Sequence, residues 1–596
     1  MVNLSGVLSN NNLMKRIRPI SIPALGLFLA ILPFHLRSCD PKSSAALSPL
    51  DHRQVKVEGE IGRRIDITMR NNILKLDVDR VFLAHFRKKS AAPSVRDGFV
   101  GAGMLLDALV RFAHYSGDAE MIRMKNRVAE ELVKTQEPDG YMGIFTPEKR
   151  MQGWDTHEGG YIILALAADH RYFRNERSLQ AARKYADLLI SKNVPIITGL
   201  EDAFLALYRQ TDDSKYLDYC IKQFGLAEFR RGNSRHVYGY LERCLMQVIL
   251  HQMKPDSRLL YKPHVAVEFL VNFDGMDVIG TSGMWEHMNT TQEGHDCNGE
   301  TCATAYILWL MHGLLQAEGN SFYGDVMERS LYNALFAAQS PDGRQLRYFT
   351  DTESAKEYYP DDYFCCPNNF RRIVSDLPQM IYYQGENGVV VNLYNRSKAE
   401  FRLAGTRVAV EQITDYPSSG DVLIRVDPER GRRFDLGLRI PSWCQNATVS
   451  VNGESVNGTL RPGAFHTIGR LWKKGDEVRL AMPMDWRIIR GKNQQYRKAA
   501  LMRGPVVYTM NNADNGFLKE KDEVTVDVSS ISGPAPDPYF RPGGLRCIAD
   551  SRIGKGQAAR KLTLTEFIDP GGIKTFFFLS GDENRIMDDE FVTRQY

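Results

Sequence analysis

The most distinctive segment of the chain begins with Cys297-Asn298-Gly299-Glu300-Thr301-Cys302 and ends with Tyr363-Phe364-Cys365-Cys366-Pro367-Asn368-Asn369. It holds four of the nine cysteines in the 596-residue chain. Glu300 and Cys302 lie two positions apart and Cys365 and Cys366 are adjacent, so the two ends offer three thiolates and one carboxylate. That donor set suffices for a closed tetrahedral Zn²⁺ site, and a metal-bound thiolate is also a candidate nucleophile. The alternatives are ordinary buried cysteines, or a vicinal disulfide between Cys365 and Cys366.

The residues between these two ends predict a pair of packed helices. Apolar side chains recur at helical spacing from Ala305 to Leu315 and again from Phe322 to Phe336, with the turn Glu318-Gly319-Asn320 between them. Helices are therefore predicted over 301–317 and 321–338. The two halves of the donor set would then be a helix start and a loop further along the chain, brought together by tertiary structure.

Three motifs in this region resemble those of the β-L-arabinofuranosidase family, the glycoside hydrolases of family 127 and their relatives. They are Glu300-Thr301-Cys302 ahead of a helix, Asp325-Val326-Met327-Glu328-Arg329-Ser330-Leu331-Tyr332-Asn333, and Cys365-Cys366-Pro367-Asn368. The resemblance is strongest over residues 280–375 and diffuse elsewhere between positions 90 and 500, as in a divergent member of the family.

The resemblance implies a zinc site and a retaining mechanism with a cysteine nucleophile. By position, the zinc ligands would be Glu300, Cys302, Cys365 and Cys366, and the nucleophile would be Cys365. The acid/base would be Glu286, with the neighbouring Trp285 as an apolar wall that raises its pKa. Glu293 and Asp296 are the alternatives for the acid.

Helical periodicity dominates from Asp97 to Tyr383. Serial helical hairpins of this kind indicate either a solenoid or a closed α/α toroid, and the resemblance favours an (α/α)6 toroid whose loops line a funnel. Besides the two helices above, the predicted helices cover 101–116, 119–134, 159–173, 177–191, 200–211, 214–226, 237–252 and 369–381.

Two loops between these helices combine aromatic rings with hydrogen-bonding groups, as a sugar subsite requires. One is Asp139-Gly140-Tyr141-Met142-Gly143, and the other is Trp154-Asp155-Thr156-His157-Glu158. The family carries an Asn-His-Glu-type motif near the second loop, which implies that His157 and Glu158 contact substrate. Tyr141, Trp154, Trp285 and His236 complete the predicted substrate-binding set. The alternative is that Asp155 or Thr156 caps a helix while His157 packs in the interior.

The chain departs from the family at two further positions. Where the family places additional histidines in the helices after these loops, this chain has Leu164 and Ile197. A related furanose or a branched pectic sugar therefore fits the sequence as well as a terminal β-L-arabinofuranose does.

The first residues predict export. Lys15, Arg16 and Arg18 precede an apolar run from Ile20 to Phe34, which is typical of a secretory signal. The segment then ends Leu36-Arg37-Ser38-Cys39-Asp40, which resembles a bacterial lipoprotein cleavage site with Cys39 as the lipidated residue. A plain exported protein and a retained short anchor are the alternatives. Periplasmic or cell-surface localisation is therefore predicted, with the membrane contacted only through the lipid anchor.

The remaining segments predict strands. Residues 52–80 alternate apolar and polar in short patches, and period-two alternation returns from Gly388, with Asn452-Gly453 as a hairpin turn. The predicted fold class is multidomain α + β, an (α/α)6 toroid with C-terminal β-sandwich domains. The predicted boundaries are 1–39 for the export segment, 40–90 for a linker with N-terminal strands, 91–383 for the barrel, 384–490 for a β-sandwich and 491–596 for a second β-rich region.

Composition agrees with a globular enzyme that does not bind nucleic acid. The chain is 43% hydrophobic and 25% charged with a net charge of +4, and it has no basic run or phosphate-binding glycine loop. The predicted function is a retaining, exo-acting glycoside hydrolase that releases an L-arabinofuranose-like sugar from pectic oligosaccharides. The alternatives are another toroid enzyme, a lyase or inverting hydrolase with structural zinc, or a surface glycan-binding protein. Glycan binding by the β domains has only Trp443 and Trp486 as sequence support.

Overall fold

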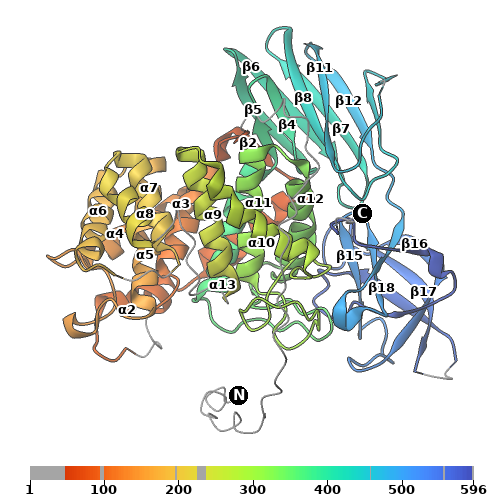
Figure 1. Cartoon of the computed structure of the whole chain (residues 1–596), viewed down its shortest axis with the longest axis horizontal. Coiled ribbons are helices and arrows are strands. Elements are labelled where there is room, and N and C mark those ends of the chain that lie inside the picture. The colour runs from red at the N-terminus through yellow and green to blue at the C-terminus, as the bar shows by residue number, and fades with distance from the viewer. Residues whose placement is uncertain are drawn as a thin grey trace, which may run out of the picture. The chain divides into compact units, whose positions relative to one another are not determined.

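The computed structural model describes residues 47–93, 99–194, 198–224, 236–456, 458–554 and 558–592 (Figure 1). The predicted export segment, including Cys39, lies outside these residues, so export and lipid anchoring stay predictions. Among the helices in the described ranges, none combines the length and apolar character that crossing a bilayer requires.

The centre of the structure is a closed ring of helices. Each helix of the ring packs against the next, and the last one returns to the first. Ring helices such as α11 are buried on nearly every side. Their apolar residues accordingly lie all around the helix rather than along one stripe. The ring consists of α3 (Ala102–Ser116), α5 (Trp154–Phe173), α7 (Leu200–Thr211), α9 (Val237–Met253), α11 (Thr301–Glu318) and α13 (Cys365–Asp376).

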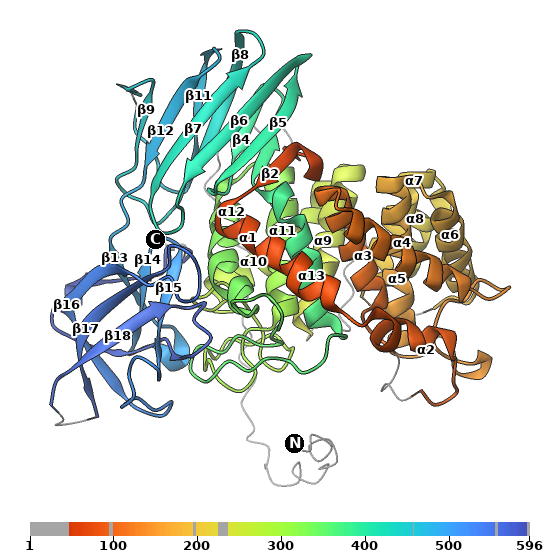
Figure 2. The same cartoon turned by 180° about the vertical axis from the view of Figure 1, so that it is seen from behind.

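An outer layer of helices covers this ring. Each outer helix packs against an inner one and buries a single stripe, as α4 does with Met121, Val128 and Leu132. The outer layer consists of α4 (Ala119–Lys134), α6 (Glu176–Ser191), α8 (Ser214–Phe224), α10 (Tyr261–Asn272), α12 (Ser321–Ser330) and, against α13, α1 (Gly59–Ile67) (Figure 2). Multidomain α + β architecture with an α/α toroid is thereby confirmed. Helix α10 was not predicted, and α13 begins at Cys365 rather than at 369.

The sequence predicts short strands over 52–80, whereas the structure is mostly helical there. Only β2 (Val55–Val57) is a strand there, and helix α1 and further short helical turns follow it. Ile61, Ile65, Met69 and Ile73 are all buried and recur every fourth residue, which is helical spacing. The local alternation of Ile65 and Ile67 hid this longer period.

Two sheets form a β-sandwich after the barrel. The first sheet has the order β1 (Ser48–Pro49), β3 (Tyr382–Gln384), β4 (Gly388–Val391), β8 (Arg432–Ile440) and β11 (Ala464–Trp472). The second has the order β10 (Glu454–Ser455), β9 (Thr448–Val451), β12 (Asp476–Ala481), β7 (Asp421–Pro428), β6 (Thr406–Thr414), β5 (Ser397–Leu403) and β2. Asn452 and Gly453, with φ of 53° and 86°, form the predicted tight turn between β9 and β10. The N-terminal segment thus supplies one edge strand to each sheet.

A third sheet with its own apolar core follows. Its order is β20 (Phe578–Ser580), β16 (Val524–Pro536), β17 (Leu545–Ile553), β18 (Arg560–Glu566), β15 (Val506–Asn511), β14 (Ala499–Arg503), β13 (Trp486–Arg490) and β21 (Ile586–Met587), with β19 (Gly572–Lys574) paired to β15.

A buried charged cluster joins the sandwich to the barrel. Arg439 of β8 is fully buried and forms ion pairs with Asp325 and Glu328 of α12. The indole N–H of Trp443 donates to Glu328 at 3.0 Å. Trp443 is therefore committed to this junction rather than to glycan. Trp486 packs edge-on against Tyr508 in the third sheet.

Arg439→Met is expected to lower the free energy of unfolding by about 3–5 kcal/mol, because it leaves two buried carboxylates without their cation. Differential scanning calorimetry should show a clearly lowered melting temperature. Arg407→Met is the matched control, because Arg407 and its partner Glu400 are largely exposed and such pairs contribute about 0–1 kcal/mol. Equal effects of the two substitutions would contradict a structural role for the cluster.

Candidate active site

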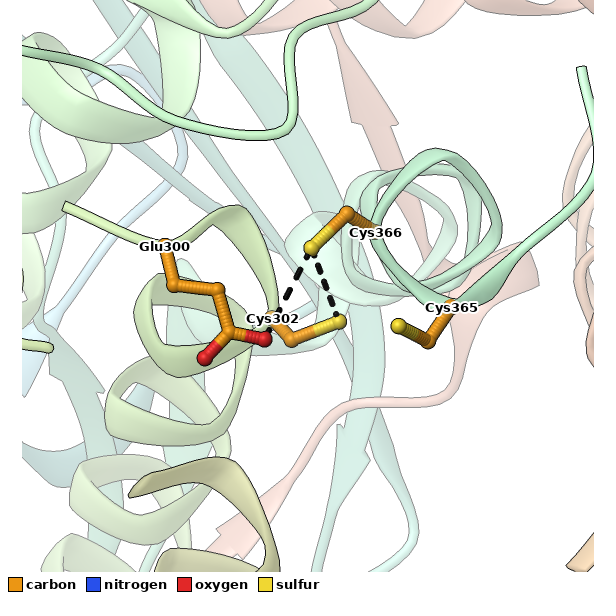
Figure 3. A group of neighbouring side chains, drawn as sticks. All are labelled: Glu300, Cys302, Cys365 and Cys366. Carbon is orange, nitrogen blue, oxygen red and sulfur yellow. Dashed lines mark hydrogen bonds between the residues drawn. The ribbon is translucent and has the colours of Figure 1, made fainter. Parts of the chain in front are cut away.

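The predicted donor set converges at the starts of two neighbouring inner helices. Glu300 is the N-cap residue of α11 and Cys302 lies in its first turn, while Cys365 and Cys366 are the first two residues of α13. One ligand atom from each of the four residues lies within 4.8 Å of the others (Figure 3). The second half-site is thus a helix start, not the predicted loop. Helix N-termini carry a partial positive charge, which favours thiolates and carboxylates.

Tight turns deliver the chain to both helix starts. Gly299 has φ of 71° just before Glu300, and a Cβ there would lie 2.8 Å from the Thr281 side chain. Phe364, just before Cys365, also has a positive φ of 79°, and its N–H donates to the Val100 carbonyl at 2.9 Å. A non-glycine residue in this region is strained, and such strain is typical of functional sites.

The four donors form a cluster of free thiols and one carboxyl group, with no disulfide. The Sγ of Cys366 lies 3.2 Å from that of Cys302 and 3.7 Å from Oε1 of Glu300. The amide of Asn369 donates to the Cys302 sulfur at 3.2 Å. The other Glu300 oxygen, Oε2, is buried without a hydrogen-bond partner among the described residues. A bound cation would give this oxygen, which lies beside three sulfurs, the partner that it lacks. The donor set therefore fits a zinc-class metal.

Cys365 differs from the other two cysteines in its environment. It is 7% exposed, whereas Cys302 and Cys366 are fully buried. Hydrogen bonds with the Cys302 and Cys366 thiols hold the pKa of Cys365 well below its usual range, against the effect of burial. Burial raises the pKa of both Cys302 and Cys366. Cys365 is therefore the thiol of the cluster whose pKa is lowered and the one with some exposed surface.

Glu286 lies beside this thiol. The hydroxyl of Tyr348 donates to Oε1 of Glu286 and lies 3.2 Å from Sγ of Cys365. Burial, and then the nearby charge of Cys365, raises the pKa of Glu286, while the Tyr348 hydrogen bond lowers it. His236 Nε2 lies 3.9 Å from the other carboxylate oxygen. The site therefore pairs an acid of raised pKa with a thiol of lowered pKa.

Tyr348 was missed by the sequence analysis. It lies in a loop outside the matching motifs and belongs to no periodic pattern, so only spatial proximity identifies it. The alternative acid Asp296 instead pairs with His295 at 2.8 Å in an exposed position. The thiol of Cys297 lies outside the cluster of four donors, and burial raises its pKa to about 11.

Four of the predicted substrate residues are two histidines near Cys365, a tryptophan packed against one of them and a tryptophan next to Glu286. The charge of Cys365 acts on both His157 and His236, although burial dominates and lowers the pKa of His157 to about 3. Trp154 packs edge-on against His157 and is 37% exposed. Trp285 is 59% exposed, and its role as an apolar wall for Glu286 stays a prediction.

Tyr141 and Glu158 have structural contacts instead of the predicted substrate contacts. Tyr141 is fully buried, and its hydroxyl donates to Asp155 at 2.9 Å. Both oxygens of Glu158 accept backbone N–H groups at 2.7 Å, from Gly101 and Gly103 at the start of α3. A loop motif of aromatic and acidic residues looks the same whether its side chains face a ligand or the interior, which is why sequence did not separate the two cases.

Two family models and a curated relative point to the same family. The family model described as the GH127 catalytic domain of β-L-arabinofuranosidase matches residues 57–225 and 271–379, and the GH127 middle domain matches 388–484. A curated relative, the non-reducing end β-L-arabinofuranosidase of Bifidobacterium longum, is 25% identical over 491 residues, 67% of this chain and 73% of the relative.

Solved structures agree in fold. A GH127 β-L-arabinofuranosidase from Geobacillus stearothermophilus T6 is similar with a TM-score of 0.72 at 23% identity, over 88% of this chain and 100% of that one. A second GH127 β-arabinofuranosidase gives a TM-score of 0.78 at 21% identity, over 91% of this chain and 99% of that one.

Cys366→Ser is expected to abolish tight metal binding at the cluster, because it removes a fully buried thiolate ligand. With Co²⁺ as the probe, the thiolate-to-metal absorption of the wild type should disappear. Cys297→Ser is the control, because Cys297 lies outside the four-donor cluster. An unchanged absorption in Cys366→Ser would exclude the cluster as the metal site.

Proposed function

The chain belongs to the GH127 family of β-L-arabinofuranosidases, and from that premise we propose that it is a retaining, exo-acting enzyme with Cys365 as nucleophile. Glu286 is its acid/base, and its substrate is an L-arabinofuranose-like sugar at the end of a pectic oligosaccharide. The predicted export signal ending at Cys39 would place it outside the cytoplasm, where such glycans occur.

The contact that carries this proposal is the Tyr348 hydroxyl between Glu286 and Cys365. Oε1 of Glu286 and Sγ of Cys365 both contact this hydroxyl oxygen, so these two atoms lie close together. An inverting mechanism needs about 6.5–9.5 Å between its two catalytic groups, to leave room for a water molecule. The short spacing instead matches retaining enzymes, whose catalytic groups are about 5–5.5 Å apart. A thiol takes the place of the second carboxylate here.

A zinc ion fits among Glu300, Cys302, Cys365 and Cys366. When bound, it would keep the sulfurs deprotonated near neutral pH, where a free thiol is mostly protonated. The partner-less Oε2 of Glu300 supports this assignment.

In the first step, Sγ of Cys365 attacks the anomeric carbon while the bond to the leaving oxygen breaks. Glu286 gives its proton to that oxygen, and a thioglycosyl intermediate remains on Cys365. In the second step, the Glu286 carboxylate takes a proton from water, whose oxygen attacks the anomeric carbon and releases the Cys365 thiolate. Two displacements at the same carbon return the original configuration.

Substrate contacts are assigned to Trp154, His236 and Trp285. His157 is fully buried like Tyr141, and its Nε2 lies 3.2 Å from the Tyr238 hydroxyl, so it packs in the interior. The aromatic faces suit stacking on a sugar, and the imidazole of His236 suits its hydroxyl groups. Leu164, one of the two departures from the family, lies two turns beyond His157 on α5 and lines a cavity at the C-terminal ends of the inner helices. It therefore gives no information about sugar specificity, and Ile197 lies outside the described residues. Arabinose-containing and pectic oligosaccharides are the substrates to test.

Cys365→Ser is expected to lower kcat by at least about 10³-fold, because a serine hydroxyl at this position stays protonated and is a far weaker nucleophile. Turnover of an aryl arabinofuranoside measures this loss, and proton NMR of the wild-type product should show the β-anomer first. Wild-type rates in Cys365→Ser, or an α-anomer as the first product, would rule out the mechanism.

Tyr348→Phe is expected to lower kcat/KM about 10- to 100-fold, the typical effect of losing a hydrogen bond to a charged group. Since that hydrogen bond lowers the pKa of Glu286, its loss raises this pKa further. The acid must be protonated for the first step, so the alkaline limb of the kcat/KM profile should move to higher pH. Tyr359→Phe is the control, because Tyr359 packs against the Tyr348 ring. A profile that does not move would exclude Tyr348 as a partner of Glu286.

A further inference from the structure

A second group of metal-ligand side chains lies at the opposite ends of the inner helices. The cysteine cluster is at the starts of α11 and α13, whereas this group surrounds the ends of α3 and α13. It consists of Asp51, His52 and His114, each of which offers one ligand atom within 4.8 Å of the other two. His114 is in the last turn of α3, and the other two belong to the turn between β1 and β2.

The surroundings of His52 are those of a metal ligand. Its imidazole is fully buried, and Nε2 lies 3.3 Å from Oδ1 of Asp376. Asp376 also accepts from Arg111 at 2.7 Å and from the indole of Trp309 at 2.8 Å, so it is ionised and can only accept. An imidazole with a single N–H that donates to this carboxylate carries its proton on Nε2, which leaves Nδ1 as a bare lone pair.

That Nδ1 is buried and has no hydrogen-bond partner among the described residues. Buried polar atoms without partners are rare and call for an explanation such as a bound ion. A histidine that donates one N–H to a carboxylate while its other nitrogen is free has the arrangement in which metal-bound histidines are usually held.

The other two ligands face each other. Nε2 of His114 lies 3.1 Å from Oδ1 of Asp51, a contact that a shared cation would replace. Arg111 lies one turn before His114 on α3. Its positive charge is compensated, because it pairs with Asp107 at 3.1 Å and with Asp376 at 2.7 Å. Asp51 caps the turn before β2, with Oδ1 accepting the Arg53 N–H at 3.0 Å, so Oδ2 is the carboxylate oxygen that remains for the ion.

The group has access to solvent and room for further ligands. Asp51 lines a cavity of about 800 Å³, together with Tyr172, Trp309 and Asp376. Asp51 is the ligand that lines this cavity, so an ion held with His52 and His114 has a coordination position open to water on that side, as in sites built from two histidines and one carboxylate.

We propose that Asp51, His52 and His114 bind a zinc-class divalent metal ion that ties the N-terminal segment to inner helix α3. The segment concerned supplies edge strand β1 to one sheet of the sandwich and β2 to the other. The ion therefore links the sandwich to the barrel at the end away from the cysteine cluster. This second site does not depend on the proposed glycosidase mechanism.

Cobalt titration of the full-length chain after chelator treatment tests the proposal. The wild type should bind two ions, of which only one produces thiolate-to-metal absorption. His114→Ala and Asp51→Asn should each lose one ion and keep that absorption. Cys302→Ser should lose the absorption and keep the other ion, so failure of the cysteine site is distinguishable from failure of this one. His52 is left intact because its burial makes a folding defect the expected result of its replacement.

His170→Ala is the matched control, because His170 is also a partly buried histidine paired with a carboxylate, Glu176, at 3.1 Å. It should still bind two ions. In the wild type, the ion that gives no thiolate absorption should also raise the melting temperature, and this rise should be absent in His114→Ala and Asp51→Asn. Binding of a single ion by the wild type, retention of both ions by His114→Ala and Asp51→Asn, or loss of an ion in His170→Ala would each overturn the proposal.

Discussion

The meeting of two helix N-termini, those of α11 and α13, is the constraint on which the rest of the structure depends. Three thiols and a carboxyl group are buried there within 4.8 Å of one another. Burying several groups that ionise to the same charge is costly unless a cation or oriented dipoles compensate. The helix dipoles supply part of that compensation. Oε2 of Glu300 has no hydrogen-bond partner among the described residues, and this oxygen suits the site to a metal ion.

The toroid explains why residues so distant in sequence share one site. Inner helices alternate with outer helices along the chain, so all inner helices run in the same direction and their N-termini gather at one end. Trp154 and His157 open α5, His236 precedes α9, and the four clustered donors lie at the starts of α11 and α13. The opposite end collects the C-terminal residues of the same helices, including His114 and Asp376. One topology therefore produces two separate clusters of functional groups.

The β domains contribute by holding the barrel. Arg439 binds the two carboxylates of α12, and Asn333, in the turn after α12, donates to the carbonyl of Pro505 and accepts from the N–H of Val507 in the third sheet. The Asp325-to-Asn333 motif that pointed to the family is therefore an interface motif. Its residues contact the sheets and position α12 behind α11, whose start holds two of the four clustered donors.

The sequence by itself determined the class of fold, the positions of most helices, the switch to strands and the identity of the four-donor set. Those features depend on local periodicity and on residue type, both of which can be read along the chain. It did not determine which polar residues face the site. Glu158 and His157 are neighbours on α5, yet one holds the start of α3 and the other lies beside Cys365. Only tertiary structure decided that division, the role of Tyr348 and the pairing of His52 with His114, because each depends on contacts between residues that are far apart in the chain.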